Sequence, residues 1–251
     1  MFTKHCNKRM VYYHLVCICV LLVTGCASQK IWTYGIEPES ISPVIIDKSV
    51  AIPPFSDQRL NENNNMFAMY LIPLMPFGWQ EYNTPEGAQM HMNSGIWFWK
   101  PNEDIAKAAA EELNASHIFK EAFFTFRESN APIVLKGTIK STKYNSKLFS
   151  YGLSVYGPLL WVVGFPSTTI NNDLILSFKL VDKIKNVVLW EKEYQEKINR
   201  CNWLYYTRSD FEYSALLKTI MADVINDIRL SSDSIRTGLK LTLKWRQLIF
   251  D

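Results

Sequence analysis

The sequence predicts an α/β (α+β) domain in which a single mixed sheet of about five strands carries two main helices packed on it. Three observations predict this class: several runs with apolar residues at alternate positions, two segments with apolar residues at helical spacing, and a composition that is 48% hydrophobic and 14% aromatic. An aromatic-rich insertion at 66–100 and an apolar hairpin at 145–172 are added to this core. The domain is expected to cover residues 45–230, with a carboxy-terminal tail over 231–251.

The first 25 residues have the three parts of a secretory leader. A basic region comes first, an apolar run follows over residues 15–23, and the small residues Thr24 and Gly25 end the segment. An apolar run of this length, rising about 1.5 Å per residue, is too short to cross a hydrocarbon core of about 30 Å. Residues 1–25 are therefore predicted to be a signal peptide and not a membrane anchor.

The leader ends in a cysteine motif. The residues Val23-Thr24-Gly25-Cys26 resemble the lipobox of bacterial lipoproteins, which implies cleavage between Gly25 and Cys26 and lipidation of the Cys26 thiol. Two or three acyl chains, at about 0.8 kcal/mol per buried CH₂, form an effectively permanent anchor. The alternatives are an ordinary leader with a chance cysteine or a short signal anchor, and the polar stretch after Cys26 favours the lipoprotein. By the sorting rule of enteric lipoproteins, Ala27 implies the periplasmic face of the outer membrane.

The charge and the cysteine content of the mature chain are counted without the leader. The whole chain has 27 basic and 24 acidic residues, and the leader holds three of the basic ones, so 24 of each remain. A neutral chain gives no electrostatic reason to expect a nucleic-acid partner. Only Cys26 and Cys201 survive processing. With Cys26 lipidated, the domain is expected to fold without an internal disulfide.

The first elements of the mature chain are a tether and a strand. Residues 26–44 contain the lipidated cysteine and a polar stretch that is predicted to be a tether of at most about 60 Å when extended. A β-rich run that ends at Ile52, before two prolines, predicts the first strand. Asp57 and Arg59 follow in a polar loop, which fits an ordinary strand exit, the favoured interpretation, or a partner-binding turn.

A helix is predicted to follow the aromatic-rich insertion. Pro101 and Asn102 are expected to cap it, and apolar residues recur at four-residue spacing from Ile105 to Leu113. Residues 117–126 fit either an extension of this helix or a separate strand.

Three further runs predict the rest of the sheet. Apolar residues alternate over 131–144 and again over 174–181, and a third run follows over 187–194. The last two runs are separated by a short polar turn and are predicted to form a hairpin.

The last main element is predicted to be a helix. Ser209 and Glu212 have the spacing of a capping box, and a stripe of apolar residues extends from Leu217 to Ile228. Beyond this helix, residues 239–246 alternate apolar and basic side chains. They fit a late strand or an amphipathic tail.

The order of these elements resembles a known group of proteins. A strand ending at Pro54-Phe55, a helix over 105–113, a strand through Leu135-Lys136-Gly137, a hairpin ending at Trp190 and a final helix are similar to bacterial lipoproteins with a fold like the amino-terminal domain of the Tol periplasmic protein. These include the curli secretion lipoprotein, the Pel polysaccharide lipoprotein and the lipoprotein activators of peptidoglycan synthases. The resemblance implies non-enzymatic accessory, scaffolding or secretion work, through rings or contacts with a larger envelope machine.

The apolar hairpin at 145–172 holds the candidate contact residues. If its apolar surface is exposed, it is expected to touch the bilayer or a neighbouring subunit, while its prolines and glycines argue against a spanning helix. The alternative, slightly favoured from the sequence, is a core hairpin beneath the 66–100 segment. The candidate membrane or partner contacts are Tyr156, Leu159, Leu160, Trp161 and Phe165.

The sequence offers no cofactor, metal or catalytic motif. His91 and His117, the histidines left after processing, have no metal-ligand spacing to another His or Cys, and no phosphate-binding glycine loop is present. Cys201 is interpreted as a small packed residue. The glycines that flank Ser154 lie one residue too far apart for a nucleophile elbow.

Taken with the lipobox, these features predict a membrane-anchored periplasmic lipoprotein that acts as a non-enzymatic accessory or assembly factor in the cell envelope. Its expected partners are the membrane, through the lipid anchor, and an envelope protein or further copies of itself. The alternative function is an oligomeric export channel that inserts the 145–172 hairpin into the outer membrane. A hydrolase that uses Cys201 or Ser154 is a distant third.

Overall fold

The computed structural model describes residues 30–36, 43–87, 97–127, 131–206, 212–237 and 239. The predicted signal peptide, the lipidated Cys26, Ser209 of the predicted capping box and residues 240–251 lie outside this described part.

A mixed sheet of eight strands forms the centre of the molecule. Five of the strands lie side by side in the order β10-β9-β8-β2-β7. Their bounds are Ile46–Ile52 for β2, Phe119–Phe124 for β7, Ile133–Phe149 for β8, Thr168–Asp182 for β9 and Val187–Asn202 for β10. β2 runs parallel to β7 and β8, while β8, β9 and β10 form an antiparallel meander. The predicted mixed sheet and the predicted hairpin are therefore confirmed.

Three short strands raise the number above the predicted five. β3 (Ser56–Asp57) and β5 (Phe77–Tyr82) pair in turn with β8 beyond the end of β2, and β4 (Asn63–Met66) pairs with β5. None of the three has a long alternating apolar pattern, so the sequence did not reveal them. They form because β8, at 17 residues, is much longer than β2 and leaves a free edge for them to pair with.

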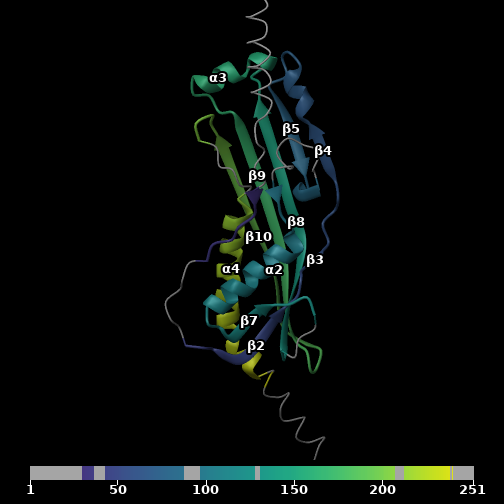
Figure 1. The fold of residues 1–251 in the computed structure, drawn as a ribbon, viewed down its shortest axis with the longest axis vertical. Coiled ribbons are helices and arrows are strands. Elements are labelled where there is room, and N and C mark those ends of the chain that lie inside the picture. The colour runs from purple at the N-terminus through teal and green to yellow at the C-terminus, as the bar shows by residue number, and fades with distance from the viewer. Residues whose placement is uncertain are drawn as a thin grey trace, which may run out of the picture.

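Both main helices pack on one face of the sheet (Figure 1). α2 (Pro101–Ala115) connects β2 to β7 as a crossover between parallel strands, and α4 (Tyr213–Leu230) follows β10. Between helices and sheet lies one apolar core, whose largest fully buried side chains include Phe119, Phe178, Ile105, Leu113, Leu135 and Leu174. The two predicted helices are thus confirmed, with the predicted stripes facing the sheet.

The starts of both helices differ from the prediction. Lys100 is the N-cap of α2 and Pro101 its first residue, with the Lys100 backbone N–H donating to Asp104 Oδ2 at 2.8 Å. Asn102 is therefore not a cap. α4 begins at Tyr213, after Glu212 in the left-handed region at φ 59°. The predicted start at Ser209 is wrong, because the Glu212 carboxylate is engaged outside the helix, 2.8 Å from Arg200 Nε.

The ambiguous segment 117–126 contains a strand. His117 takes a positive φ of 53° directly after the C-cap of α2, which ends the helix, and β7 then pairs in parallel with β2. The prediction of a helix extension was wrong, because this segment buries its apolar side chains as a strand of the sheet.

Residues 30–36 belong to the folded domain. β1 (Lys30–Ile31) pairs in parallel with β6 (Trp97–Phe98), Trp32 is part of the core, and the Tyr34 hydroxyl donates to Glu112 Oε1 at 2.7 Å. The prediction of a tether over 26–44 is therefore wrong for 30–36. This stretch contains polar residues, but burial of its aromatic rings stabilises it in a fixed position on the domain.

The molecule is elongated, and its two ends differ (Figure 1). α2 and α4 cover one half of the sheet, while β8 and β9 continue past them to a tip that carries α3 (Pro158–Val162). Among the described residues, no helix has both the length and the apolar character needed to cross a bilayer.

Candidate contact surface at the hairpin tip

The turn between β8 and β9 is a small folded unit. It contains a 3-10 turn, η3 (Ser154–Tyr156), followed by α3, whose first residue is Pro158. Gly152 has φ +80°, and a Cβ on Gly157 would lie 2.7 Å from the Ser150 Cα. Both positions therefore require glycine, one for its backbone conformation and the other for its close approach to Ser150.

A second segment from the aromatic-rich insertion completes the tip. η1 (Phe67–Leu71) and the residues after it pack against η3. The Leu74 N–H donates to the Gly152 carbonyl at 2.9 Å, and the Ser154 hydroxyl donates to the Leu71 carbonyl at 2.5 Å. These bonds join two stretches of chain about 80 residues apart, so the sequence alone did not place them together.

Trp161 fixes α3 to the end of the sheet. Its indole Nε1 donates to the Phe149 carbonyl at 3.0 Å, and its ring centroid lies 6.2 Å from that of Tyr70. The side chain is half-buried. Trp161 therefore holds the tip in shape, and Leu159 and Val162 of α3 are exposed.

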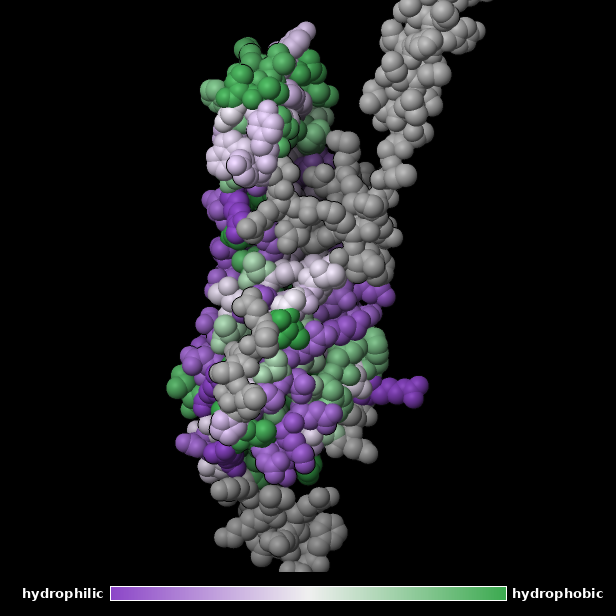
Figure 2. Space-filling view, turned by 60° about the vertical axis from the view of Figure 1, so that its left-hand side comes forward, coloured by the Kyte–Doolittle hydropathy of each residue, from purple (hydrophilic) through white to green (hydrophobic). Residues whose placement is uncertain are grey.

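The tip exposes a continuous set of large apolar side chains and no charge. Residues 66–79 and 148–172 contain no Asp, Glu, Lys or Arg. Figure 2 shows the apolar side chains gathered at this end of the molecule, whereas hydrophilic ones dominate the opposite half. We call the following residues the tip surface: Leu71, Ile72, Leu74, Leu153, Val155, Tyr156, Leu159, Val162, Val163 and Phe165. An exposed apolar surface of this kind typically marks a contact with protein or membrane.

Three of the five predicted contact residues lie on this surface, and two do not. Tyr156, Leu159 and Phe165 are exposed, at 66%, 64% and 48%. Leu160 and Trp161 are half-buried within the tip. The favoured interpretation of a core hairpin is wrong for residues 153–165, because β8 and β9 carry them beyond the reach of α2 and α4.

Sequence reasoning missed the contribution of the insertion and of the segment after β10. Leu74 is the most exposed large apolar residue of the tip, at 88%. Tyr205 and Tyr206 are exposed after β10, and the Tyr205 hydroxyl donates to the Val162 carbonyl at 3.4 Å. The absence of charge in 66–79 was the available signal. Exposed tyrosines beside aliphatic residues are typical of surfaces at a membrane–water interface.

The amino-terminal strand limits the distance between the fold and a lipid on Cys26. Because residues 30–36 are packed into the domain, only four residue steps separate Cys26 from β1, a reach of roughly 14 Å at 3.3–3.6 Å per residue. In Figure 1 the chain from β1 runs away from α3, toward β2.

A cluster of charged side chains around the buried Arg59 stabilises the sheet below the tip. The sequence did not predict this structural role. The Arg59 side chain is 3% exposed and donates to both Asp57 carboxylate oxygens, at 2.9 and 2.7 Å. It also donates to Thr142 Oγ1 at 2.6 Å and pairs with Glu86. These hydrogen bonds from Arg59 lower the pKa of Asp57. Because Arg59 is buried, the partner-binding turn is not supported, and the pair braces β3 against β8.

The described residues considered for catalysis lie on separate elements. Cys201 is exposed on β10, so its interpretation as a packed residue is wrong. His117 is exposed in the turn after α2, and His91 lies outside the described residues. Within the described ranges, no group of three or more His, Cys, Asp or Glu side chains is arranged to hold a metal ion.

Comparison with known proteins gives only distant similarities. No family model and no curated protein matches the chain. Among solved structures, a PelC dodecamer from Paraburkholderia phytofirmans shares 16% identity over 74% of this chain and 92% of its own, with a TM-score of 0.35. A variant of the same PelC in another crystal form has the same identity and TM-score, over 77% of this chain and 90% of its own. A Xanthomonas campestris protein described by the family model DUF330 shares 10% identity over 85% of this chain and 99% of its own, with a TM-score of 0.41. Likenesses at this level assign neither a family nor a function.

Proposed function

We propose that this protein is a lipid-anchored, non-enzymatic accessory or assembly lipoprotein of the cell envelope, which rests its tip surface on the membrane that holds its anchor. The observation that carries the proposal is the exposed, charge-free tip at one end of an elongated domain. The lipobox ending at Cys26 supports the anchor, and Ala27 supports the outer membrane as its location.

Energetics favour a shallow contact. Moving a Leu, Val or Phe side chain from water into an apolar environment is worth about 1.5–3 kcal/mol, and the tip surface offers several of them. α3 has five residues and is only about 7.5 Å long at 1.5 Å per residue, far less than the bilayer core. The tip therefore lies in the interface, as amphipathic anchors do.

The short chain before β1 strengthens this contact. A lipid on Cys26 holds the domain within roughly 14 Å of the bilayer at that point, because only four residue steps intervene. Insertion of the tip then becomes an intramolecular event with a high effective concentration, so even a weak tip–lipid affinity is sufficient.

Tryptophan quenching by brominated lipids tests the membrane contact. The lipidated protein is reconstituted into vesicles, and emission is compared for the native chain, Trp161→Phe and Trp190→Phe. Trp190 lies near the start of β10, at the opposite end from the tip, and serves as the matched control. We expect less quenching in Trp161→Phe than in the native chain, with Trp79 and Trp203 at the same end of the sheet contributing the remainder, and native quenching in Trp190→Phe. Equal quenching in all three proteins would refute a tip contact.

The alternative, an oligomeric export channel, rests on a different observation. Among the described strands, β10 is the outermost on its side of the sheet and is 16 residues long, so its edge is available to a second copy. The native mass of the detergent-extracted lipidated protein separates the two functions. A closed ring, with loss of membrane permeability when residues 153–165 are deleted, favours the channel, whereas a monomer favours the accessory role.

A further inference from the structure

An aromatic strip links one face of the sheet to the tip surface. On β5, Phe77 lies directly opposite Phe149 of β8, and Trp79 lies directly opposite Lys147. Further rings follow toward the tip, and neighbouring ring centroids lie between 5.6 and 6.3 Å apart. We call the following residues the aromatic strip: Trp79, Phe77, Phe149, Tyr151 and Phe165. The first four side chains are half-buried, and Phe165 is exposed and belongs to the tip surface. The strip therefore continues the apolar tip along one side of the sheet.

Lys147 places one positive charge on this strip. Its Nζ lies 4.9 Å from the centroid of the Phe77 ring, a cation–π contact, and its side chain is exposed. Lys143, earlier on β8, is paired with Glu81. In the part of the chain that the structure describes, Lys147 has no carboxylate within ion-pair distance. Its charge is therefore available to an anion from outside the protein, while its stem lies along apolar surface.

The position of Lys147 matches the depth of lipid headgroups when the tip contacts a bilayer. β8 ends at Phe149, and Lys147 lies two residues before that end, about 7 Å at roughly 3.4 Å per residue. The polar region on each side of the hydrocarbon core is roughly 5–8 Å thick. Residues 148–172 contain no charge, so none lies between Lys147 and the tip on this strand. Lys147 is thus the first charge of β8 that the headgroups meet.

We propose that Lys147 and the aromatic strip bind the headgroup of an anionic phospholipid in the membrane that holds the anchor. The Lys147 ammonium contacts the lipid phosphate by a charge-assisted hydrogen bond, and the rings of Phe77 and Phe149 pack on the glycerol and the upper acyl carbons. This inference rests on the proposed function, because the strip reaches the lipid only when the tip surface contacts the membrane.

The choice of an anionic lipid follows from charge. A zwitterionic headgroup carries its own ammonium group beside the phosphate, which offsets the attraction to Lys147, whereas phosphatidylglycerol keeps a net negative charge. A lysine near an anionic membrane surface favours the contact by about fivefold. The site is therefore expected to enrich anionic lipid around the tip by a factor of about this size.

Tryptophan quenching with the bromine on one lipid at a time tests the inference. The full lipidated protein is reconstituted into vesicles of equal parts phosphatidylcholine and phosphatidylglycerol, and the acyl chains of either one lipid or the other are brominated. We expect brominated phosphatidylglycerol to quench more strongly, with a local enrichment of up to about fivefold. Lys147→Gln should remove this preference, and Lys147→Arg should retain it because the charge is kept.

Lys140→Gln is the matched control. It removes the same charge from an exposed lysine of β8, but Lys140 is paired with Glu193 and lies farther from the tip. The preference for phosphatidylglycerol should therefore equal that of the native chain. Thermal unfolding of each variant, followed by circular dichroism, confirms that the fold is retained.

Three outcomes would overturn the inference alone: equal quenching by the two brominated lipids in the native chain, a preference that persists in Lys147→Gln, or an equal loss of preference in Lys140→Gln. The last outcome would assign the preference to overall charge. In all three, quenching itself shows that the tip still contacts the membrane. Absence of quenching by either lipid would instead overturn the proposed function and this inference together.

Discussion

Phe55 lies with its ring against Gly137 of β8, and this contact illustrates how single residues decide the packing. A Cβ built on Gly137 would lie 2.5 Å from three atoms of the Phe55 ring. The ring is buried and packs edge-to-face on Phe178 at a centroid distance of 5.6 Å, so it has no room to withdraw.

Gly137→Ala is therefore expected to destabilise the protein by about 1–3 kcal/mol, the usual cost of overpacking a core. Chemical denaturation monitored by circular dichroism measures the change. Gly35→Ala is the control, because a Cβ on Gly35 meets no atom within 4 Å, and its unfolding midpoint should stay close to that of the native protein. If both variants unfold at the native midpoint, the close packing on Gly137 is not significant for stability.

At the scale of elements, the first residue of α4 connects this helix to the longest strand. Tyr213 is 1% exposed, its ring stacks on Trp99 at a centroid distance of 4.8 Å, and its hydroxyl donates to the Thr142 carbonyl of β8 at 2.6 Å. Burial raises the pKa of Tyr213 well above its usual range, so the hydroxyl stays protonated and available as a donor.

Tyr213→Phe keeps the ring and removes only this donor. We expect a loss of about 1–3 kcal/mol in the free energy of unfolding, since a buried carbonyl loses its partner. Tyr206→Phe, at an 80% exposed position, should change the free energy by less than about 0.5 kcal/mol. Equal stabilities for the two variants would show that the Tyr213 hydroxyl does not hold α4 to β8.

The hairpin β8–β9 is the element that determines where the candidate site lies. Its two strands have 17 and 15 residues, while β2 and β7 have 7 and 6, so the pair extends well past the helices. Residues 153–165 then lie beyond the helices, and most of their large apolar side chains stay exposed. The same extension leaves the strand edge on which β3 and β5 assemble.

For the whole molecule, the proposed function makes the tip surface and the position of β1 act together. The anchor and the tip would contact one membrane at two points, and the chain between them sets how often the tip is at the bilayer. A longer chain after Cys26 lowers that effective concentration.

Insertion of 20 Gly and Ser residues after Ser28 tests this coupling. Such a linker has a root-mean-square length of roughly 25 Å, well beyond the four native residue steps. We expect less quenching of Trp161 by brominated lipids, with lipid attachment unchanged. The same linker added after Asp251 leaves the anchor distance unaltered and should leave quenching at the native level. Unchanged quenching after both insertions would mean that the tip binds lipid without help from the anchor.

The sequence by itself determined the features that depend on local pattern. Alternating apolar residues predicted β8 and β9, because side chains on a strand alternate between its faces, and runs of β-forming residues predicted β2 and β10. Four-residue spacing predicted α2 and most of α4 for the corresponding reason in a helix. The absence of charge over 148–172 identified the candidate contact segment.

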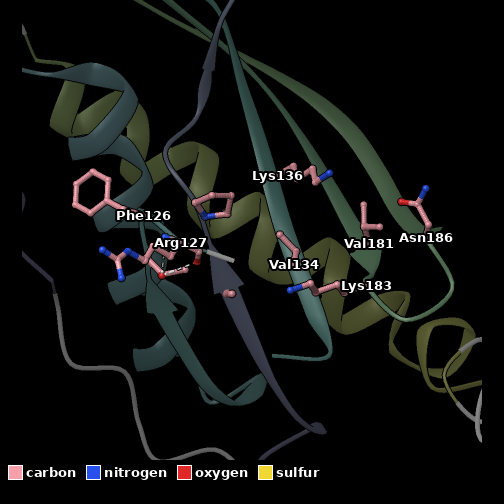
Figure 3. Close-up of a pocket in the computed structure, with 10 residues that line it drawn as sticks. Phe126, Arg127, Val134, Lys136, Val181, Lys183 and Asn186 are labelled. Carbon is pink, nitrogen blue, oxygen red and sulfur yellow. Dashed lines mark hydrogen bonds between the residues drawn. The ribbon is translucent and has the colours of Figure 1, made fainter. Parts of the chain in front are cut away.

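Only the tertiary structure decided what depends on contacts between distant residues. The short strands β3, β4 and β5 are held by β8 pairing and not by their own pattern. Trp32 joins the core from a stretch that reads as a linker, and Leu74 joins the tip surface from an insertion about 80 residues before α3. The pocket in Figure 3 gathers side chains from β2, β8 and β9 and from the residues that follow β7. These outcomes depend on burial and strand pairing in three dimensions, which local sequence does not encode.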